Sequence, residues 1–182
     1  MADSVAGEYG SLLAAASFSA RAHRHQLRKD RETPYAAHPF RACLIVRHVF
    51  GVDDPEVLAT ALLHDTIEDT PTDRDDLIEH FGQNVAAWVS ALSKDMRLPE
   101  QEREAAYMET LSASPAPVKI CKLADMFDNL LDWASLSEQQ RKRTIARSHQ
   151  YLEALDKSLG DTVRPAFKLV QQLLAEVAST SK

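Results

Sequence analysis

Apolar residues recur every three to four positions along almost the whole chain, and no segment alternates with a period of two for long. Glycine is scarce, with five residues in 182, whereas β-sandwiches and barrels need frequent turn residues. A chain of this length can bury a hydrophobic core of its own. The pattern therefore predicts an all-α fold, a single-domain helical bundle over residues 1–182.

The same periodicity, together with capping residues and Pro and Gly as breakers, sets the expected helix bounds. Thr72 with Asp75 resembles an N-cap followed by an acid three positions on, and Gly82 should end the short helix that it opens. The core should cover about residues 8–160, and the C-terminal helices at 137–178 should pack on it. The expected helices span 11–27, 39–50, 55–69, 73–81, 85–92, 99–111, 116–131, 137–159 and 162–178.

Charge and composition exclude several classes of protein. The net charge of −6 argues against non-specific nucleic-acid binding. No apolar run approaches the ~18 residues of a membrane span, and the N-terminal MADSVAGEYG lacks the pattern of a signal peptide. We therefore expect a cytoplasmic protein without a membrane partner. Cys43 and Cys121 lie in apolar stretches, which is typical of small buried residues rather than of a disulfide or zinc site.

The segment ALLHDTIEDT breaks a rule of helix design. After an apolar face, it places His64, Asp65, Glu68 and Asp69 in its last turn and a half. On a continuous helix, His64 would stack with Glu68, and Asp65 with Asp69. Three carboxylates at this end oppose the helix dipole and repel one another. A bound divalent cation would compensate that charge; the alternative is a solvated acidic helix end.

The segment VKICKLADMFDNLLDW has almost no polar face, so its helix should be buried. Asp125 and Asn129 nevertheless share one face inside it, and Lys122 lies a turn earlier. A buried charge needs a partner or a metal. Asp125 is thus either a metal ligand or one half of an ion pair with Lys122 or another basic residue.

Two features precede these segments. His38 lies between two prolines where a helix begins, a rigid position from which a side chain can be aimed, although a capping or core histidine is the alternative. The basic run RAHRHQLRKDR contains Arg28 and Lys29. A helix dipole alone would favour cations there, but in an acidic protein they also suit an anionic, phosphate-bearing substrate.

Two histidines and two aspartates from three helices would supply nitrogen and oxygen ligands without a thiolate. That set suits Mn²⁺, with Fe²⁺, Zn²⁺ and Mg²⁺ as alternatives. A bound metal lowers the pKa of its water and polarises a phosphoryl oxygen. Glu68 and Asp69 would orient and deprotonate that water or protonate the leaving oxygen. The residues therefore predict a metal-dependent phosphohydrolase.

The order His38, His64-Asp65, Asp125 resembles the HD phosphohydrolase superfamily. A closer resemblance, over about residues 8–160, is to the hydrolase domain of the RelA/SpoT alarmone enzymes and their free-standing small relatives. It rests on RKDRETPYAAHP, LLHDTIEDT, Glu102-Arg103 and VKICKLADMFDNL. The HDxxED form is much more specific than a bare His-Asp pair. The resemblance implies a helical fold and Mn²⁺-dependent removal of the 3′-pyrophosphate from guanosine 3′,5′-bis(diphosphate).

The resemblance also implies roles for individual residues. The substrate would be a guanine nucleotide alarmone, and the protein a monomer or homodimer. Alternatives are an adenosine alarmone, another nucleotide phosphate ester, or a non-catalytic nucleotide-binding module. The implied metal ligands are His38, His64, Asp65 and Asp125, the water-activating pair is Glu68 and Asp69, and the substrate-binding residues are Arg28, Lys29, Tyr35 and Asn129.

The chain departs from the family pattern around the last aspartate. That pattern places a basic residue directly after it, an aromatic residue or His before the Asn, and an Arg two positions after the Asn. This chain has Met126, Asp128 and Leu131 there, and Met96 where small hydrolases often have Lys. Cations that could contact phosphate are missing, so the departure bears on substrate choice and affinity rather than on hydrolytic chemistry.

Overall fold

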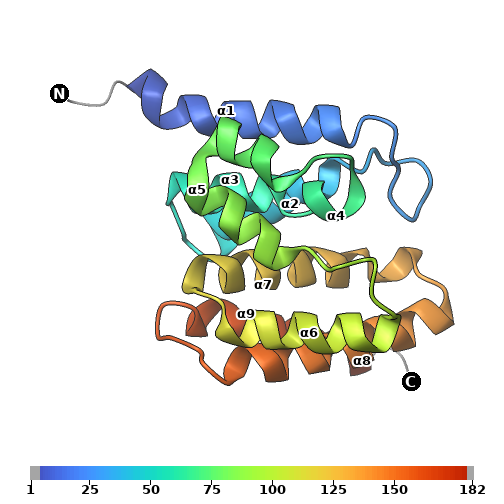
Figure 1. Cartoon of the computed structure of the whole chain (residues 1–182). Coiled ribbons are helices and arrows are strands. Elements are labelled where there is room, and N and C mark those ends of the chain that lie inside the picture. Colours follow the sequence, from blue (N-terminus) through green and yellow to red (C-terminus); the bar gives the residue numbers. More distant parts are fainter. Residues whose placement is uncertain (1–4, 180–182) are drawn as a thin grey trace.

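The computed structural model describes residues 5–179, with side chains from residue 9 onward, and all regular elements in that range are helical (Figure 1). An isolated pairing of Leu27 with Pro34 is the one β-bridge among them. The all-α prediction is confirmed. Residues 1–4 and 180–182, which the single-domain prediction included, lie outside the described range. No helix within residues 5–179 is long and apolar enough to cross a membrane.

The helices follow the expected order, and the C-terminal pair packs on the core, since α8 contacts α6 and α9 contacts α7. Their bounds are α1 Val5–Ala22, α2 Ala37–Leu44, the π-helix η1 Ile45–Val49, α3 Pro55–Leu63, α4 Thr66–Asp69, α5 Arg74–Leu92, α6 Glu100–Ala113, α7 Ala116–Leu131, the 3₁₀-helix η2 Asp132–Ser135, α8 Glu138–Asp156 and α9 Arg164–Ser179.

Helix α7 lies at the centre of the molecule. It contacts α2, α3 and α5 on one side and α8 and α9 on the other, and Figure 1 shows it between these two layers. Leu123 and Ala124 are completely buried. Its bounds match the expected ones, because an almost continuous apolar sequence is stable only when both faces of the helix are covered. Cys121 on this helix and Cys43 on α2 are free thiols, as predicted; Cys121 is buried, and Cys43 is half-buried against the same core.

Helix α3 joins two buried clusters. Val57, Leu58 and Ala61 belong to the large cluster around α7, whereas Leu62 and Leu63 pack with α1 and α5. Each fully buried side chain of this size stabilises the fold by roughly 1.5–3 kcal/mol relative to an exposed one. The end of α3 is therefore held firmly from several sides, and the next residue along the chain is a candidate ligand.

The first helix ends at Ala22, whereas the sequence predicted that it continues to Leu27. Beyond it the chain folds back, and the N–H of Arg28 donates to the carbonyl of Thr33 at 2.8 Å. The carboxylate of Asp30 accepts backbone N–H groups inside this loop. Side chains that bind nearby backbone groups compete with helix formation, so the polar stretch forms a loop instead.

The expected helix to Asp69 is also interrupted, because α3 ends before His64 and α4 begins at Thr66. Nδ1 of His64 lies 2.8 Å from the carbonyl oxygen of Ala61, and the hydroxyl of Thr66 donates to the last carbonyl of α3 at 2.7 Å. These side chains take carbonyls that a continuous helix would use. The predicted continuous helix is therefore wrong, and the break lets His64 and Asp65 point to the same place. The predicted proximity of Asp65 and Asp69 is retained, because the N–H of Asp69 donates to the carbonyl of Asp65 at 2.9 Å.

Helix α5 begins one residue later than predicted. Its capping box is formed by Asp73 and Asp76 rather than by Thr72 and Asp75. The hydroxyl of Thr72 is instead within 2.9 Å of the Thr70 hydroxyl, so the next residue takes the capping position. The capping chemistry was predicted correctly and its register was not.

The kink inside α5 generates a stability prediction. Gly82 has φ 83° and ψ 174°, a conformation essentially restricted to glycine, at the point where the sequence predicted a helix end. We expect Gly82→Ala to lower the free energy of unfolding by about 1–3 kcal/mol in denaturant titrations. Gly10→Ala, which enters open space on α1, should raise it by about 0.5–1 kcal/mol. Equal effects of the two changes would contradict this account.

Candidate active site

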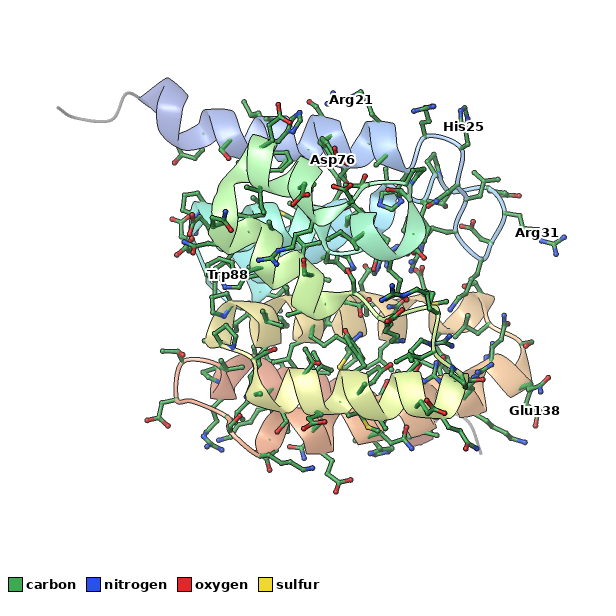
Figure 2. The ribbon with its side chains drawn as sticks, viewed as in Figure 1. Arg21, His25, Arg31, Asp76, Trp88 and Glu138 are labelled. Carbon is green, nitrogen blue, oxygen red and sulfur yellow. The ribbon has the colours of Figure 1, made fainter. Side chains whose placement is uncertain are left out.

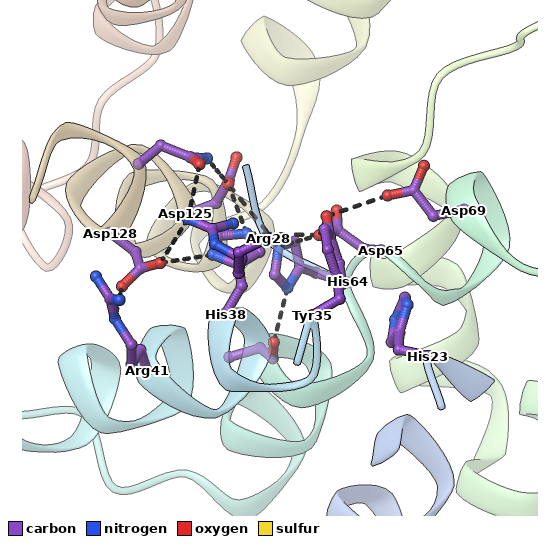
Figure 3. Close-up of polar contacts among 12 residues, drawn as sticks. His23, Arg28, Tyr35, His38, Arg41, His64, Asp65, Asp69, Asp125 and Asp128 are labelled. Atoms are coloured by element: carbon purple, nitrogen blue, oxygen red, sulfur yellow. Dashed lines mark hydrogen bonds and ion pairs between the residues drawn. The ribbon is translucent and has the colours of Figure 1, made fainter. Parts of the chain in front are cut away.

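Three predicted ligands converge where α2, α3 and α4 meet (Figure 3). Nε2 of His64 lies 3.2 Å from Nε2 of His38 and 3.1 Å from Oδ2 of Asp65. Nε2 of His38 lies 3.5 Å from the same carboxylate oxygen. Ligands at about 2.1 Å from one cation, at right angles to each other, lie about 3 Å apart. The spacing of these three atoms fits a single divalent ion.

Asp125 reaches the same place from α7. Its Oδ1 lies 3.2 Å from Nε2 of His38 and 3.9 Å from Nε2 of His64. Its other oxygen pairs with Nζ of Lys122 at 2.8 Å, and the amide of Asn129 donates to Oδ1 at 2.5 Å. The ion pair with Lys122 is thus present, and the oxygen that faces the histidines leaves the metal-ligand interpretation open as well.

Both imidazole rings turn Nδ1 toward a group that can only accept a hydrogen bond. For His64 this is the carbonyl of Ala61 at 2.8 Å, and for His38 it is the carboxylate of Asp128 at 2.7 Å. Nδ1 therefore carries a hydrogen, and in its neutral form each ring aims its Nε2 lone pair at the other ring and at the carboxylates. This arrangement is repulsive without a positive charge in the middle. The donor set therefore fits a divalent metal.

The electrostatics of the cluster favour positive charge. Burial opposes the charged form of His38, but hydrogen bonds to Asp125 and Asp128 outweigh it and raise its pKa to about 9. Burial likewise opposes ionisation of Asp65, and the adjacent His64 and His38 lower the pKa of that carboxyl below its usual range. Protons on the imidazoles and a divalent cation are thus alternative ways of balancing the two carboxylates.

Glu68 and Asp69 follow on α4 and line the same cavity. The carboxylate of Glu68 accepts the backbone N–H of Lys94 at 2.9 Å. The hydroxyl of Tyr35 lies 2.7 Å from Oδ2 of Asp65 and 3.1 Å from Oδ2 of Asp69, so it links the two carboxylates. Partial burial raises the pKa of Glu68 and of Asp69, and the charge of Asp65 adds to both shifts. Raised values bring a carboxyl group nearer to the range that proton transfer requires.

The predicted substrate-binding residues all line this cavity of about 540 Å³, but in different states. Arg28 is buried and paired with Asp132 at 2.5 Å and Asp128 at 3.4 Å. Lys29 forms no ion pair with any residue of the described range; partial burial of its amine and the charge of Arg28 lower its pKa. Lys29 is therefore the better placed of the two to receive a new anion.

The rest of the basic run faces away from the cavity. Arg21 and Arg31 are exposed, and Figure 2 shows both pointing outward. Their exposure agrees with the alternative interpretation, in which the helix dipole and solvation account for most of the positive charge in this run. The run contributes two cations, Arg28 and Lys29, and the apolar Leu27 to the cavity lining.

The opposite wall of the cavity was not predicted. Arg143 and Arg147 on α8 line it, and both pair with the carboxylate of Glu100, Arg147 at 3.0 Å. Lys94 and Lys122 also face it, packed against the rings of two tyrosines. The sequence did contain a signal, since arginines four apart share one face of a helix. Met126 lies in the wall between the two ends and contributes no charge.

Comparisons with known proteins agree with this geometry. A family model described as an HD domain matches residues 15–154. The chain is 38% identical over 170 residues to the guanosine-3′,5′-bis(diphosphate) 3′-pyrophosphohydrolase MESH1 of Homo sapiens, covering 88% of this chain and 95% of that one. It is 35% identical over 167 residues to the MESH1 of Danio rerio, covering 91% and 93%.

A solved structure shares the fold. It is described as a metazoan ortholog of SpoT that hydrolyses ppGpp, and it matches with a TM-score of 0.78 and 28% identity, over 89% of this chain and 94% of the other. The resemblance inferred from the motifs is thereby confirmed. The chain belongs to the HD-domain family of metal-dependent hydrolases and, within it, to the group that includes the MESH1 enzymes.

Proposed function

We propose that this protein is a Mn²⁺-dependent hydrolase that removes the 3′-pyrophosphate from guanosine alarmones, giving GDP or GTP and pyrophosphate. One observation carries the proposal: His38, His64, Asp65 and Asp125 face one point in a cavity that also contains Glu68 and Asp69. The activity printed for the MESH1 relatives supports the choice of substrate. A nucleotide substrate agrees with these relatives, whereas a cytoplasmic location and a monomeric or homodimeric state remain predictions.

Each part of the site has a chemical task in this reaction. When bound, the metal supplies a Lewis acid that acidifies a water molecule and polarises a phosphoryl oxygen. One carboxylate of the Glu68–Asp69 pair accepts a proton as water attacks the phosphorus attached to the 3′-oxygen. The 3′-oxygen takes up a proton as its bond to phosphorus breaks, and the raised pKa values suit both transfers.

The cations proposed to bind phosphate lie at the rim of the cavity and on α8. Lys29 has no carboxylate partner in the described range, and Arg143 and Arg147 lie opposite it on the far wall. Ion pairs between exposed side chains contribute little to stability, so a phosphate can replace Glu100 at modest cost. These arginines would offset the cations missing at Met126 and Leu131.

A second candidate rests on those same missing cations. A pocket with fewer positive side chains near the metal centre would also suit a nucleotide phosphate ester that carries less charge. An adenosine alarmone, which has the same phosphates and a different base, is a further alternative. A non-catalytic nucleotide sensor is disfavoured, because acids beside an anionic ligand weaken binding and are useful only for turnover.

The first prediction from the proposed function concerns the reaction products. Metal-free protein supplied with Mn²⁺ should release GDP and pyrophosphate from guanosine 3′,5′-bis(diphosphate), as resolved by anion-exchange chromatography. Orthophosphate as the main product would favour another phosphate ester. No release from any guanosine or adenosine alarmone would overturn the proposal.

The second prediction separates ligands from proton-transfer groups. His64→Ala and Asp65→Ala should lose bound Mn²⁺ and activity together. Glu68→Gln should keep Mn²⁺ and lower kcat by about 10²–10⁴-fold. Metal content and single-substrate kinetics measure both effects, with Glu153→Gln, an exposed site outside the cavity, as control. Equal metal loss in all three site variants would show that the roles are divided wrongly.

The third prediction tests the wall on α8. Arg143→Met and Arg147→Met should each raise KM about 10-fold or more, because a charge-assisted hydrogen bond contributes about 1.5–3 kcal/mol, while kcat changes little. Lys142→Met is the matched control, since it removes the same kind of charge from the same helix outside the cavity. An unchanged KM in both arginine variants would remove α8 from the substrate site.

A further inference from the structure

Asp128 is a completely buried carboxylate that the catalytic proposal does not use. It lies on α7, three residues after Asp125. Its Oδ2 is 2.7 Å from Nδ1 of His38, on the side of the ring opposite the metal centre (Figure 3). Burying an ionised carboxylate is costly unless it is paired and hydrogen-bonded. The side chains around Asp128 therefore show how its buried negative charge is balanced.

Those partners include two guanidinium groups. Oδ1 lies 2.6 Å from Nε of Arg41, and Oδ2 lies 3.4 Å from Arg28. Asp132 approaches the same two arginines from the other side, at 2.5 Å from Arg28 and 3.0 Å from Arg41. Two carboxylates and two guanidiniums balance one another. The two arginines therefore supply the counter-charge that the buried Asp128 needs, and its contact with His38 can serve as a hydrogen bond that orients the ring.

We propose that Asp128 is a positioning residue for His38, which rests on the proposed role of His38 as a metal ligand. The carboxylate accepts the Nδ1 hydrogen, fixes the orientation of the ring and keeps the Nε2 lone pair directed at the metal centre. An outer carboxylate of this kind also makes the ligating nitrogen more basic. His64 differs, because its Nδ1 donates to the neutral carbonyl of Ala61.

The arrangement is a property of this chain rather than of the family pattern, which has an aromatic residue or histidine at the position of Asp128. The difference extends to Arg28. Its guanidinium is occupied by Asp128 and Asp132, so in this protein it stabilises the carboxylate that positions His38. Asp128 thus lacks the substrate contact expected at this position, and in its place it positions His38 at the metal centre.

The test compares Asp128→Asn with Asp132→Asn. Both changes remove one negative charge from the same pair of arginines, but Asp128 alone touches His38. The dissociation constant for Mn²⁺ is measured on metal-free protein by competition with a fluorescent chelator. We expect Asp128→Asn to raise it about 10–100-fold and Asp132→Asn to change it by less than about 3-fold. Equal constants for the two variants would overturn the proposal.

Thermal unfolding of the metal-free variants separates positioning from a purely structural role, which would lower Tm and leave the dissociation constant unchanged. If Asp128→Asn does not fold, the double variant Asp128→Asn with Arg41→Gln removes both members of one ion pair and should show the same loss of affinity. Since the readout is metal binding, it is independent of turnover. Asp128-dependent binding of Mn²⁺ without alarmone hydrolysis would overturn the proposed function and leave this inference standing.

Discussion

The burial of α7 on both faces is the constraint on which the site depends. Apolar residues cover this helix, yet it carries Lys122, Asp125 and Asp128 into the interior. Each of these charges costs several kcal/mol to bury without a partner. The surrounding elements supply the partners: the loop after α1 supplies Arg28, and α2 supplies His38 and Arg41. The candidate metal centre lies where these requirements meet.

Charge is distributed unequally across the cavity as a result. The carboxylates that line it come from α3–α4 and α7, whereas the charged residues that α8 and the segment just after α5 contribute are all cations, Arg143, Arg147 and Lys94. A metal cation next to the carboxylates and a polyphosphate next to the arginines and lysines would match this distribution of charge. Lys122 joins the two halves, because it pairs with Asp125 and packs against the ring of Tyr151 at 4.5 Å from its centre.

Much of this organisation can be predicted from local sequence signals. The bounds of α7, the opening of α8 at Ser137 and the break at Gly82 follow from apolar periodicity, a capping box and a glycine. The adjacent His64 and Asp65 could be singled out because they violate a local rule, and such violations tend to mark functional sites.

What the sequence did not reveal depends on contacts between distant residues or on competition for single carbonyl groups. The break after α3 requires that His64 and Thr66 bind carbonyls of the preceding turn, which periodicity does not encode. Arg28 and Asp128 are a hundred positions apart, so their pairing follows only from the packed fold. Taken alone, Asp128 looked like a missing substrate contact.

The pairing of Asp128 with Arg28 bears on the proposed role of α8. A guanidinium that balances a buried carboxylate is not free to bind phosphate, so under the proposed roles Arg28 supports the metal centre rather than the substrate pocket. Met126 and Leu131 remove further positive charge from α7. A polyphosphate substrate then needs cations from elsewhere, and Arg143 and Arg147 on α8 line the same cavity, both paired with the exposed Glu100 and Arg147 also with Glu104 at 3.4 Å. The anchor for His38 and the cationic wall on α8 are therefore two consequences of one redistribution of charge.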